Sequence, residues 1–280
     1  MKLSLSFLIY LAVMISTTKA QPVKAPFVAE KAEILCIYKL SYQPDSSNTQ
    51  RREEMMRLVI GKSTSRFESQ GAYLSDSIQH SMADLPDNQA NTQMLVDKLV
   101  AVPYSRFGFK IIKSRPTNLI YSYDMISTKL YTYLDEFPIA KWKVSSERSV
   151  IAGYSCQKAT IAFAGRVFEA WFTREVPVSD GPHKFYGLPG LIVKVKDVKN
   201  HYIFELTSLK KLNQILTTAL PKQAALTTKA ALLQGKRNHY ANLHITAMAL
   251  TSKGSANSPE LRTSEQNRIM KKFNNSLELR

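Results

Sequence analysis

The sequence has few cysteines and no long hydrophobic segment. Its 280 residues include only Cys36 and Cys156, too few for a scaffold held together by disulfides. The one extended apolar run begins at Leu3 and ends near Ile15, well short of the roughly 20 residues that span a bilayer as a helix. We therefore expect a mature protein without a transmembrane helix, with one domain of about 200 residues and room for an extension.

Signatures of catalysis and metal binding are also missing. The sequence contains no CxxC, HExxH, Walker-type or GxSxG motif. His239 and His244 stand five positions apart, which places them about 140° apart around a helix rather than on one face. The sequence accordingly predicts no metal site, no cofactor and no catalytic residue that a motif would identify.

The first 20 residues have the form of a cleavable signal peptide. Lys2 gives a positive start, residues 3–15 form a short apolar region, and Thr18-Lys19-Ala20 supplies the small residues before a cleavage point. Cleavage is expected after Ala20, and no cysteine stands there to accept a lipid. We expect export to the periplasm or the outer envelope.

Export bears on the two cysteines. In an oxidising compartment, Cys36 and Cys156 can form a disulfide that closes a loop of about 120 residues and stabilises the fold. The alternative is a pair of buried thiols that pack as small hydrophobic side chains. The sequence leaves both outcomes open.

Acidic residues are scarce. There are 22 Asp and Glu against 38 Lys and Arg, and residues 210–280 hold 12 basic and three acidic side chains, a net charge of +9. This region lacks the interleaved aromatic residues of a nucleic-acid-binding segment, so we expect no nucleic-acid partner. Contact with an anionic membrane surface is the functional interpretation, and improved solubility is the alternative.

The pattern of apolar residues predicts a mainly β (α+β) fold. Short stretches of branched and aromatic residues recur about every ten positions between turn residues, as in an antiparallel meander. The predicted strands cover residues 32–42, 55–60, 65–69, 107–113, 119–123, 129–134, 142–146, 158–163, 167–173, 191–196 and 202–207. Apolar residues at helical spacing predict a helical insert at 71–82 and 90–102.

The chain divides into four expected regions. They are a signal peptide at 1–20, a β domain at 21–209, a helical basic extension packed on it at 210–250, and a mobile basic tail at 251–280. Within the extension we expect helices at 209–219 and 228–240, the second capped by Thr227 or Thr228.

The segment Gly187-Leu188-Pro189-Gly190-Leu191-Ile192 predicts a tight turn that leads into a strand. Pro189 fixes φ for the second position of a type II turn, and Gly190 accepts the positive φ of the third. Leu191 and Ile192 then begin a buried strand.

These six residues and their surroundings resemble the GLPGLI family, exported proteins of Gram-negative bacteria with no settled function. The similarity covers most of residues 32–209 and includes, in the family's order, residues 153–159, 165–166, 170–177 and 181–185. The resemblance implies an exported, mainly antiparallel protein with a strongly curved sheet, shaped like a bowl or half-barrel. It implies no reaction.

Aromatic residues on the predicted strands form a candidate ligand face. Its members are Tyr121, Tyr123, Trp142, Trp171 and Arg166. Alternating positions can place the tyrosines on one side of the sheet, and an arginine five positions from a tryptophan across a hairpin can stack on it. Such a face would bind an extended peptide, glycan or lipid, and the alternative is an ordinary amphipathic sheet.

Asp180 and His183 form a second candidate site, because both side chains can perform acid–base chemistry. The alternative is a local turn in which Asp180 accepts a backbone hydrogen bond. Taken together, these features favour an exported binding protein without catalytic activity, or one that assists an outer-membrane process. An envelope hydrolase using Asp180 and His183, and a structural protein that docks through its basic tail, are the alternatives.

Overall fold

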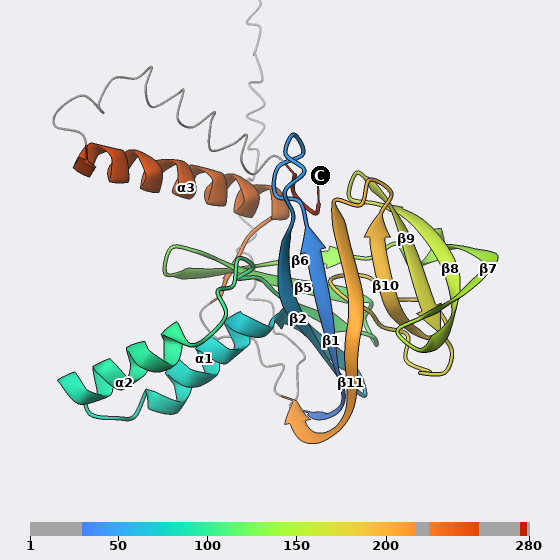
Figure 1. Cartoon of the computed structure of the whole chain (residues 1–280), viewed down its shortest axis with the longest axis horizontal. Helices are drawn as coiled ribbons and strands as arrows, with labels where there is room; N and C mark the ends of the chain where they lie inside the picture. Colours follow the sequence, from blue (N-terminus) through green and yellow to red (C-terminus); the bar gives the residue numbers. More distant parts are fainter. Residues whose placement is uncertain (1–29, 217–223, 252–274, 279–280) are drawn as a thin grey trace, which may run out of the picture.

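The computed structural model describes residues 30–216, 224–251 and 275–278 (Figure 1). The expected signal peptide lies outside these residues and stays a prediction. The described chain forms one 12-stranded sheet in the order β12-β6-β5-β4-β3-β2-β1-β11-β10-β9-β8-β7. Neighbouring strands are antiparallel, except that β12 pairs parallel with β6, so the sheet is mixed and the mainly β expectation is confirmed.

Two antiparallel meanders make up nearly all of this sheet. The first comprises β1 (Glu30–Tyr42), β2 (Arg52–Gly61), β3 (Thr64–Ser69), β4 (Lys110–Ser114), β5 (Leu119–Ile126) and β6 (Lys129–Glu136). The second comprises β7 (Lys143–Ile151), β8 (Tyr154–Phe163), β9 (Arg166–Thr173), β10 (Leu191–Asp197) and β11 (Tyr202–Leu216). The short β12 (Ala225–Leu226) lies at one edge, and pairing between β1 and β11 joins the meanders.

The hairpins of the second meander follow from two-residue turns. Ala152 and Gly153 connect β7 to β8 with φ values of 53° and 83°, and Ala164 and Gly165 connect β8 to β9 with 49° and 84°. Two successive residues with positive φ match the right-handed twist of the flanking strands, and glycine in the second place accepts that conformation readily.

One face of the sheet, here called the inner face, carries the main hydrophobic core. On β1 every second residue from Cys36 to Tyr42 is buried in it, as expected for a strand with one covered side. Strands of both meanders contribute, and so do Phe185, Tyr186 and Leu188 from the long connection between β9 and β10. This connection therefore packs against the inner face.

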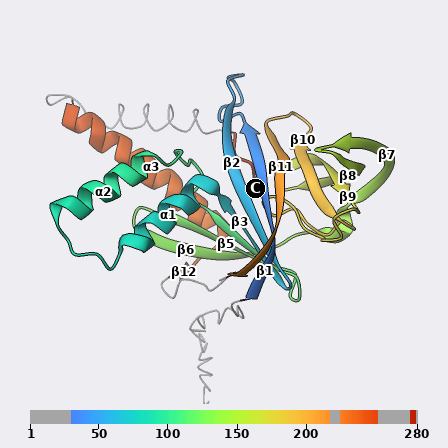
Figure 2. The same ribbon diagram turned by 60° about the horizontal axis from the view of Figure 1, so that its bottom comes forward.

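Three α-helices are present in the described part, α1 (Gln70–Met82), α2 (Gln89–Val100) and α3 (Lys229–Thr251), and a short 3-10 helix covers Ile139–Lys141. The α-helices begin at side-chain caps, where the oxygens of Ser69, Asn88 and Thr228 accept backbone N–H groups of the first turn. The helical insert and the Thr228 cap are thus as predicted. The helices gather beside the strands of the first meander, with α1 against β2 and β3 and α3 against β5 and β6 (Figure 2).

The helix expected at 209–219 was a wrong prediction, because β11 continues as a strand to Leu216. Residues 208–216 pair with the first half of β1, from Glu30 to Ile37. Without them that half of β1 would lose a whole row of backbone hydrogen bonds, so long-range pairing overrides the local helical pattern. The proposed boundary at residue 209 therefore falls inside a strand.

The expected mobile tail also needs correction for residues 275–278. Asn275 and Leu277 are buried, the latter in the main core. The remaining tail residues, 252–274 and 279–280, lie outside the described part, so the expectation of mobility is not tested for them.

The two cysteines form no disulfide. Cys36 on β1 and Cys156 on β8 are both free and buried. Strands β11, β10 and β9 lie between them, and neighbouring strands are spaced by roughly 4.8 Å, whereas a disulfide needs Cα atoms within about 7 Å. Burial raises the pKa of Cys36 to about 12, so this thiol is a poor nucleophile. Among the described helices, none is both long enough and apolar enough to cross a bilayer.

Candidate functional site

The connection between β9 and β10 carries the Gly187–Ile192 segment into the core. Leu188, Leu191 and Ile192 are buried there. The turn is not type II: the Gly190 N–H donates to the Leu188 carbonyl, two positions back, at 2.8 Å, and the Leu191 N–H donates to Val176 at 3.1 Å. An i to i+2 bond around Pro189 is a γ-turn. The positive φ expected at Gly190 is present, at 148°.

Asp180, from the same connection, is held by two cations, Lys113 on β4 and Arg115 directly after β4. Its carboxylate lies 2.5 Å from Lys113 Nζ and 3.3 Å from the Arg115 guanidinium, and it accepts the Gly181 N–H at 2.7 Å. The side chains of Asp180 and Lys113 are each only 2% exposed. Burial lowers the pKa of Lys113, while Asp180 opposes that shift. The carboxylate is therefore committed to an internal ion pair.

His183 is buried among aromatic rings. The rings of Phe67, Phe109, Phe185 and Phe204 lie between 5.5 and 6.4 Å from the imidazole, measured between centroids. Its Nε2 stands 3.5 Å from Glu278, and its Nδ1 has no hydrogen-bond partner among the residues that the structure describes. Burial lowers its pKa to about 3, with Glu278 opposing the shift, so the ring is neutral at pH 7.

Sequence reasoning brought Asp180 and His183 together as an acid–base site, and the structure gives them separate buried surroundings. A general acid or base must reach a substrate. Asp180 is saturated by Lys113 and Arg115, and His183 is enclosed by aromatic rings. These surroundings do not support the hydrolase interpretation.

The neutral His183 makes stability depend on pH. Its pKa is about 6.5 in the unfolded chain and about 3 when folded, so between these values the unfolded state binds more protons and stability falls as pH falls. Between pH 6.5 and 4.5, we expect the free energy of unfolding of the wild type to fall more steeply than that of His183→Asn. The two slopes should differ by on the order of 1 kcal/mol per pH unit. Asparagine tolerates the positive φ of 53° at this position. Urea unfolding across this range measures both slopes, and parallel slopes would contradict a buried neutral imidazole.

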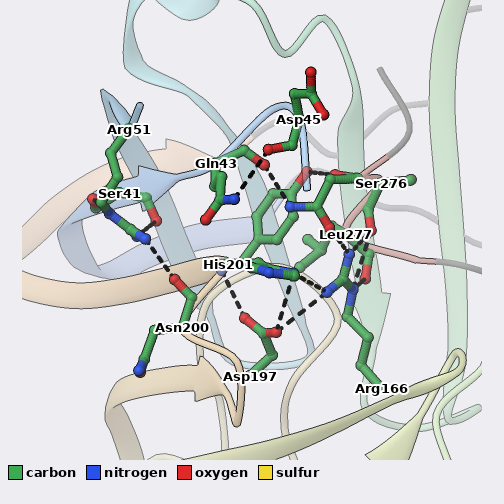
Figure 3. A network of polar contacts seen from close by, with 12 residues as sticks. Ser41, Gln43, Asp45, Arg51, Arg166, Asp197, Asn200, His201, Ser276 and Leu277 are labelled. Carbon is green, nitrogen blue, oxygen red and sulfur yellow. Dashed lines mark hydrogen bonds and ion pairs between the residues drawn. The ribbon is translucent and has the colours of Figure 1, made fainter. Parts of the chain in front are cut away.

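Arg166, at the start of β9, is the centre of a polar network (Figure 3). Its guanidinium lies 3.2 Å from the Asp197 carboxylate and 3.2 Å from His201 Nδ1. Its other N–H groups donate to the carbonyls of Ser276 and Leu277 and to the Asn275 side chain. The predicted stacking of Arg166 on Trp171 is wrong, because the guanidinium lies 5.4 Å from the Tyr202 ring instead.

A second charged group holds the other end of residues 275–278. Lys184 is buried, and its Nζ lies 2.7 Å from the Glu278 carboxylate and 2.9 Å from Asp135. Lys229 at the start of α3 also pairs with Glu278. Burial alone would raise the pKa of Glu278, but Lys184, His183 and Lys229 lower it to about 2. No local pattern in the sequence links these residues, and sequence reasoning missed the cluster.

Trp171 alternates along β9 with the buried Ala170 and Phe172, so its side chain leaves the sheet on the other face, here called the outer face, although it is partly buried and also packs against the main core. In register it stands between Lys158 of β8 and Lys194 of β10, and we call these three residues the Trp171 row. Lys158 Nζ is 5.9 Å from the indole centroid. Acidic partners surround the row, since Lys158 pairs with Glu147 at 3.1 Å and Lys194 with Glu205 at 2.8 Å. All three side chains keep partial exposure.

The other members of the predicted ligand face do not join this row. Tyr121 and Tyr123 share one side of β5, as expected, but both are buried against Ile112, Leu130 and Ala224. Trp142 packs against the main core, and its indole N–H donates to the Tyr186 carbonyl at 2.9 Å. Of the five residues, Trp142 and Trp171 keep partial exposure and both pack against the main core, and Trp171 is the one that stands in register between two lysines.

The fold and these sites define a mainly β protein whose β9–β10 connection is anchored by buried ion pairs. The profile of a family described as "Protein of unknown function (Porph_ging)" matches residues 162–194, from the end of β8 to β10. No curated protein matches the chain.

Solved structures give a likeness of fold. The structure of PNGF-II in the P21 space group matches with a TM-score of 0.50 and 17% identity over 74% of this chain and 34% of that chain. The C2 form of PNGF-II matches with a TM-score of 0.47, 17% identity, and coverage of 74% and 33%. The chain thus spans about a third of the structures it resembles.

Proposed function

We propose that this is an exported, non-catalytic protein of the cell envelope that binds an extended ligand across the outer face at the Trp171 row. Membership of the GLPGLI family and a bowl-like curvature of the sheet belong to the same proposal. The shared core, to which both meanders contribute, supports the curvature. The partly exposed Trp171, flanked by Lys158 and Lys194, is the observation that carries the proposal.

The chemistry of this row fits a glycan better than a lipid. A pyranose presents a face of C–H groups that packs on an indole ring, and its hydroxyls hydrogen-bond to ammonium and carboxylate groups beside it. Lys158, Lys194 and Glu205 supply such groups around Trp171. A lipid chain needs a continuous apolar groove, whereas this surface alternates in charge.

Substitution of Trp171 tests the proposal. We expect Trp171→Ala to weaken binding to an array of bacterial envelope polysaccharides by more than about tenfold, because buried tryptophans dominate binding energies. Val167→Ala is the matched control, since Val167 is an exposed residue on the same side of β9. It should bind like the wild type. Equal binding by all three proteins, each checked as folded by circular dichroism, would reject the Trp171 row as the ligand face.

Contact of the basic region, residues 210–280, with an anionic membrane surface is a separate proposal. Lys210 and Lys211 are exposed on β11. Lys229 and Lys236 of α3, however, pair with Glu278 and Asp124. Part of the basic charge of residues 210–280 thus serves internal contacts.

A further inference from the structure

Residues 275–278 are held in the manner of a bound peptide. Their carbonyl groups accept hydrogen bonds from side chains: Asn275 from the Tyr202 hydroxyl at 2.6 Å, Ser276 from Arg166 at 2.5 Å and Leu277 from Arg166 at 3.1 Å. They belong to no helix or strand. Hydrogen bonds to main-chain carbonyls can be made to a segment of almost any sequence, because they do not depend on its side chains.

Side-chain contacts add selectivity at three of the four positions. The Asn275 amide donates to the Gln43 carbonyl and accepts from Arg166, each at 2.6 Å. Leu277 enters the main core, and Glu278 pairs with Lys184 at 2.7 Å. The Ser276 side chain is exposed. The site thus reads the pattern Asn-x-Leu-Glu.

The receiving side is organised by contacts that do not involve this segment. Asp197 holds Arg166 and also accepts the Tyr202 N–H at 2.7 Å. Arg51 donates to the Asn200 carbonyl at 2.6 Å and to Ser41, which ties the β10–β11 turn to the end of β1 (Figure 3). A donor array fixed in this way keeps its shape when the segment leaves, and preorganisation favours binding.

We propose that Arg166, Tyr202, Gln43 and Lys184 form a polypeptide-binding site for an Asn-x-Leu-Glu segment. Residues 275–278 fill it within the molecule, and the same segment of a second copy fills it when they are displaced. An intramolecular segment competes at an effective concentration in the millimolar range, so the site is closed to dilute ligands in the intact chain. The site lies apart from the Trp171 row, which is on the outer face.

A full-length Leu277→Asp variant opens the site for a test, because a carboxylate cannot enter the apolar core at that position. The probe is a fluorescein-labelled peptide of residues 270–280 with the natural sequence, followed by fluorescence anisotropy. We expect saturable binding to the variant and binding at least about tenfold weaker to the wild type. Ser276→Ala is the matched control and should behave like the wild type.

Altered peptides decide whether the recognition is specific. Peptides with Asn275→Ala or Glu278→Gln should bind the Leu277→Asp variant at least about threefold more weakly, and Trp171→Ala in the same protein should leave peptide binding unchanged. No binding to the folded variant, or equal binding of a reversed-sequence peptide, would overturn the proposal.

A second form of the protein covers the case in which Leu277→Asp does not fold. A specific protease sequence is inserted after residue 262 of the wild-type chain, so that cleavage separates the segment containing residues 275–278 from the rest of the protein. The released segment should then exchange for the labelled peptide at equilibrium. Failure of the label to enter the cleaved protein, even after unfolding and refolding with excess peptide, would overturn the proposal.

Discussion

We expect Gly190→Ala to lower the free energy of unfolding by more than about 3 kcal/mol, since it combines overpacking with backbone strain. A Cβ at this position would lie 2.0 Å from the Thr173 carbonyl oxygen and 2.7 Å from its carbon. Both are backbone atoms at the end of β9, where Thr173 pairs with Leu191, so they cannot rotate away. The φ of 148° adds strain for any residue with a side chain.

Gly153→Ala is the control that separates strain from collision. Gly153 also has a positive φ, 83°, but apart from its own chain neighbours no atom of the described residues lies within 4 Å of the position of its Cβ. We expect this change to cost about 1 kcal/mol from conformation alone. Urea unfolding of both variants measures the difference, and equal losses would show that β9 and the γ-turn do not approach as closely as the structure places them.

Local signals explain why the meanders could be predicted. Ala164-Gly165 stands between two alternating apolar stretches, and the hairpin of β8 and β9 forms there as expected. The helical insert followed in the same way from the spacing of its apolar residues. In these elements the residues that specify the structure lie close together in the chain.

Long-range contacts explain what the sequence could not indicate. Residues 210–216 become strand because β1 needs a partner, although the two segments are far apart in sequence. Alternation placed Tyr121 and Tyr123 on one side of β5 correctly, but it cannot tell which side another part of the chain covers. A local pattern gives the period of a strand and leaves the covered face undetermined.

The same distinction applies to the candidate sites. Sequence reasoning singled out Arg166, Asp180 and His183, and all three are central to buried networks. Their partners come from distant segments: Lys113 from β4, and Ser276, which is 110 positions from Arg166. Because a polar side chain acquires its role from such partners, the residues could be identified but their roles could not.

Asp180→Asn is the second change for which we expect a large loss of stability. It removes the carboxylate but keeps the shape, and so leaves Lys113 with a buried charge and without its Asp180 partner. Breaking a buried pair from one side costs about 3 to 5 kcal/mol, because the remaining charge keeps its desolvation penalty. The loss should appear in the free energy of unfolding at pH 7, measured in urea.

Asp76→Asn is the matched control, because Asp76 lies at the same 2.5 Å from Lys110 but both side chains are largely exposed, at 53% and 38%. An exposed pair contributes only about 0 to 1 kcal/mol, so this change should have little effect. In Asp180→Asn, burial favours the neutral form of Lys113 and the main opposing charge is gone, whereas the unfolded chain keeps the lysine protonated. Its stability should therefore recover relative to the wild type as pH rises from 7 to 9, because the unfolded state binds more protons. Similar losses at both positions, with no dependence on pH, would mean that water reaches Lys113 and that the ion pair is not buried.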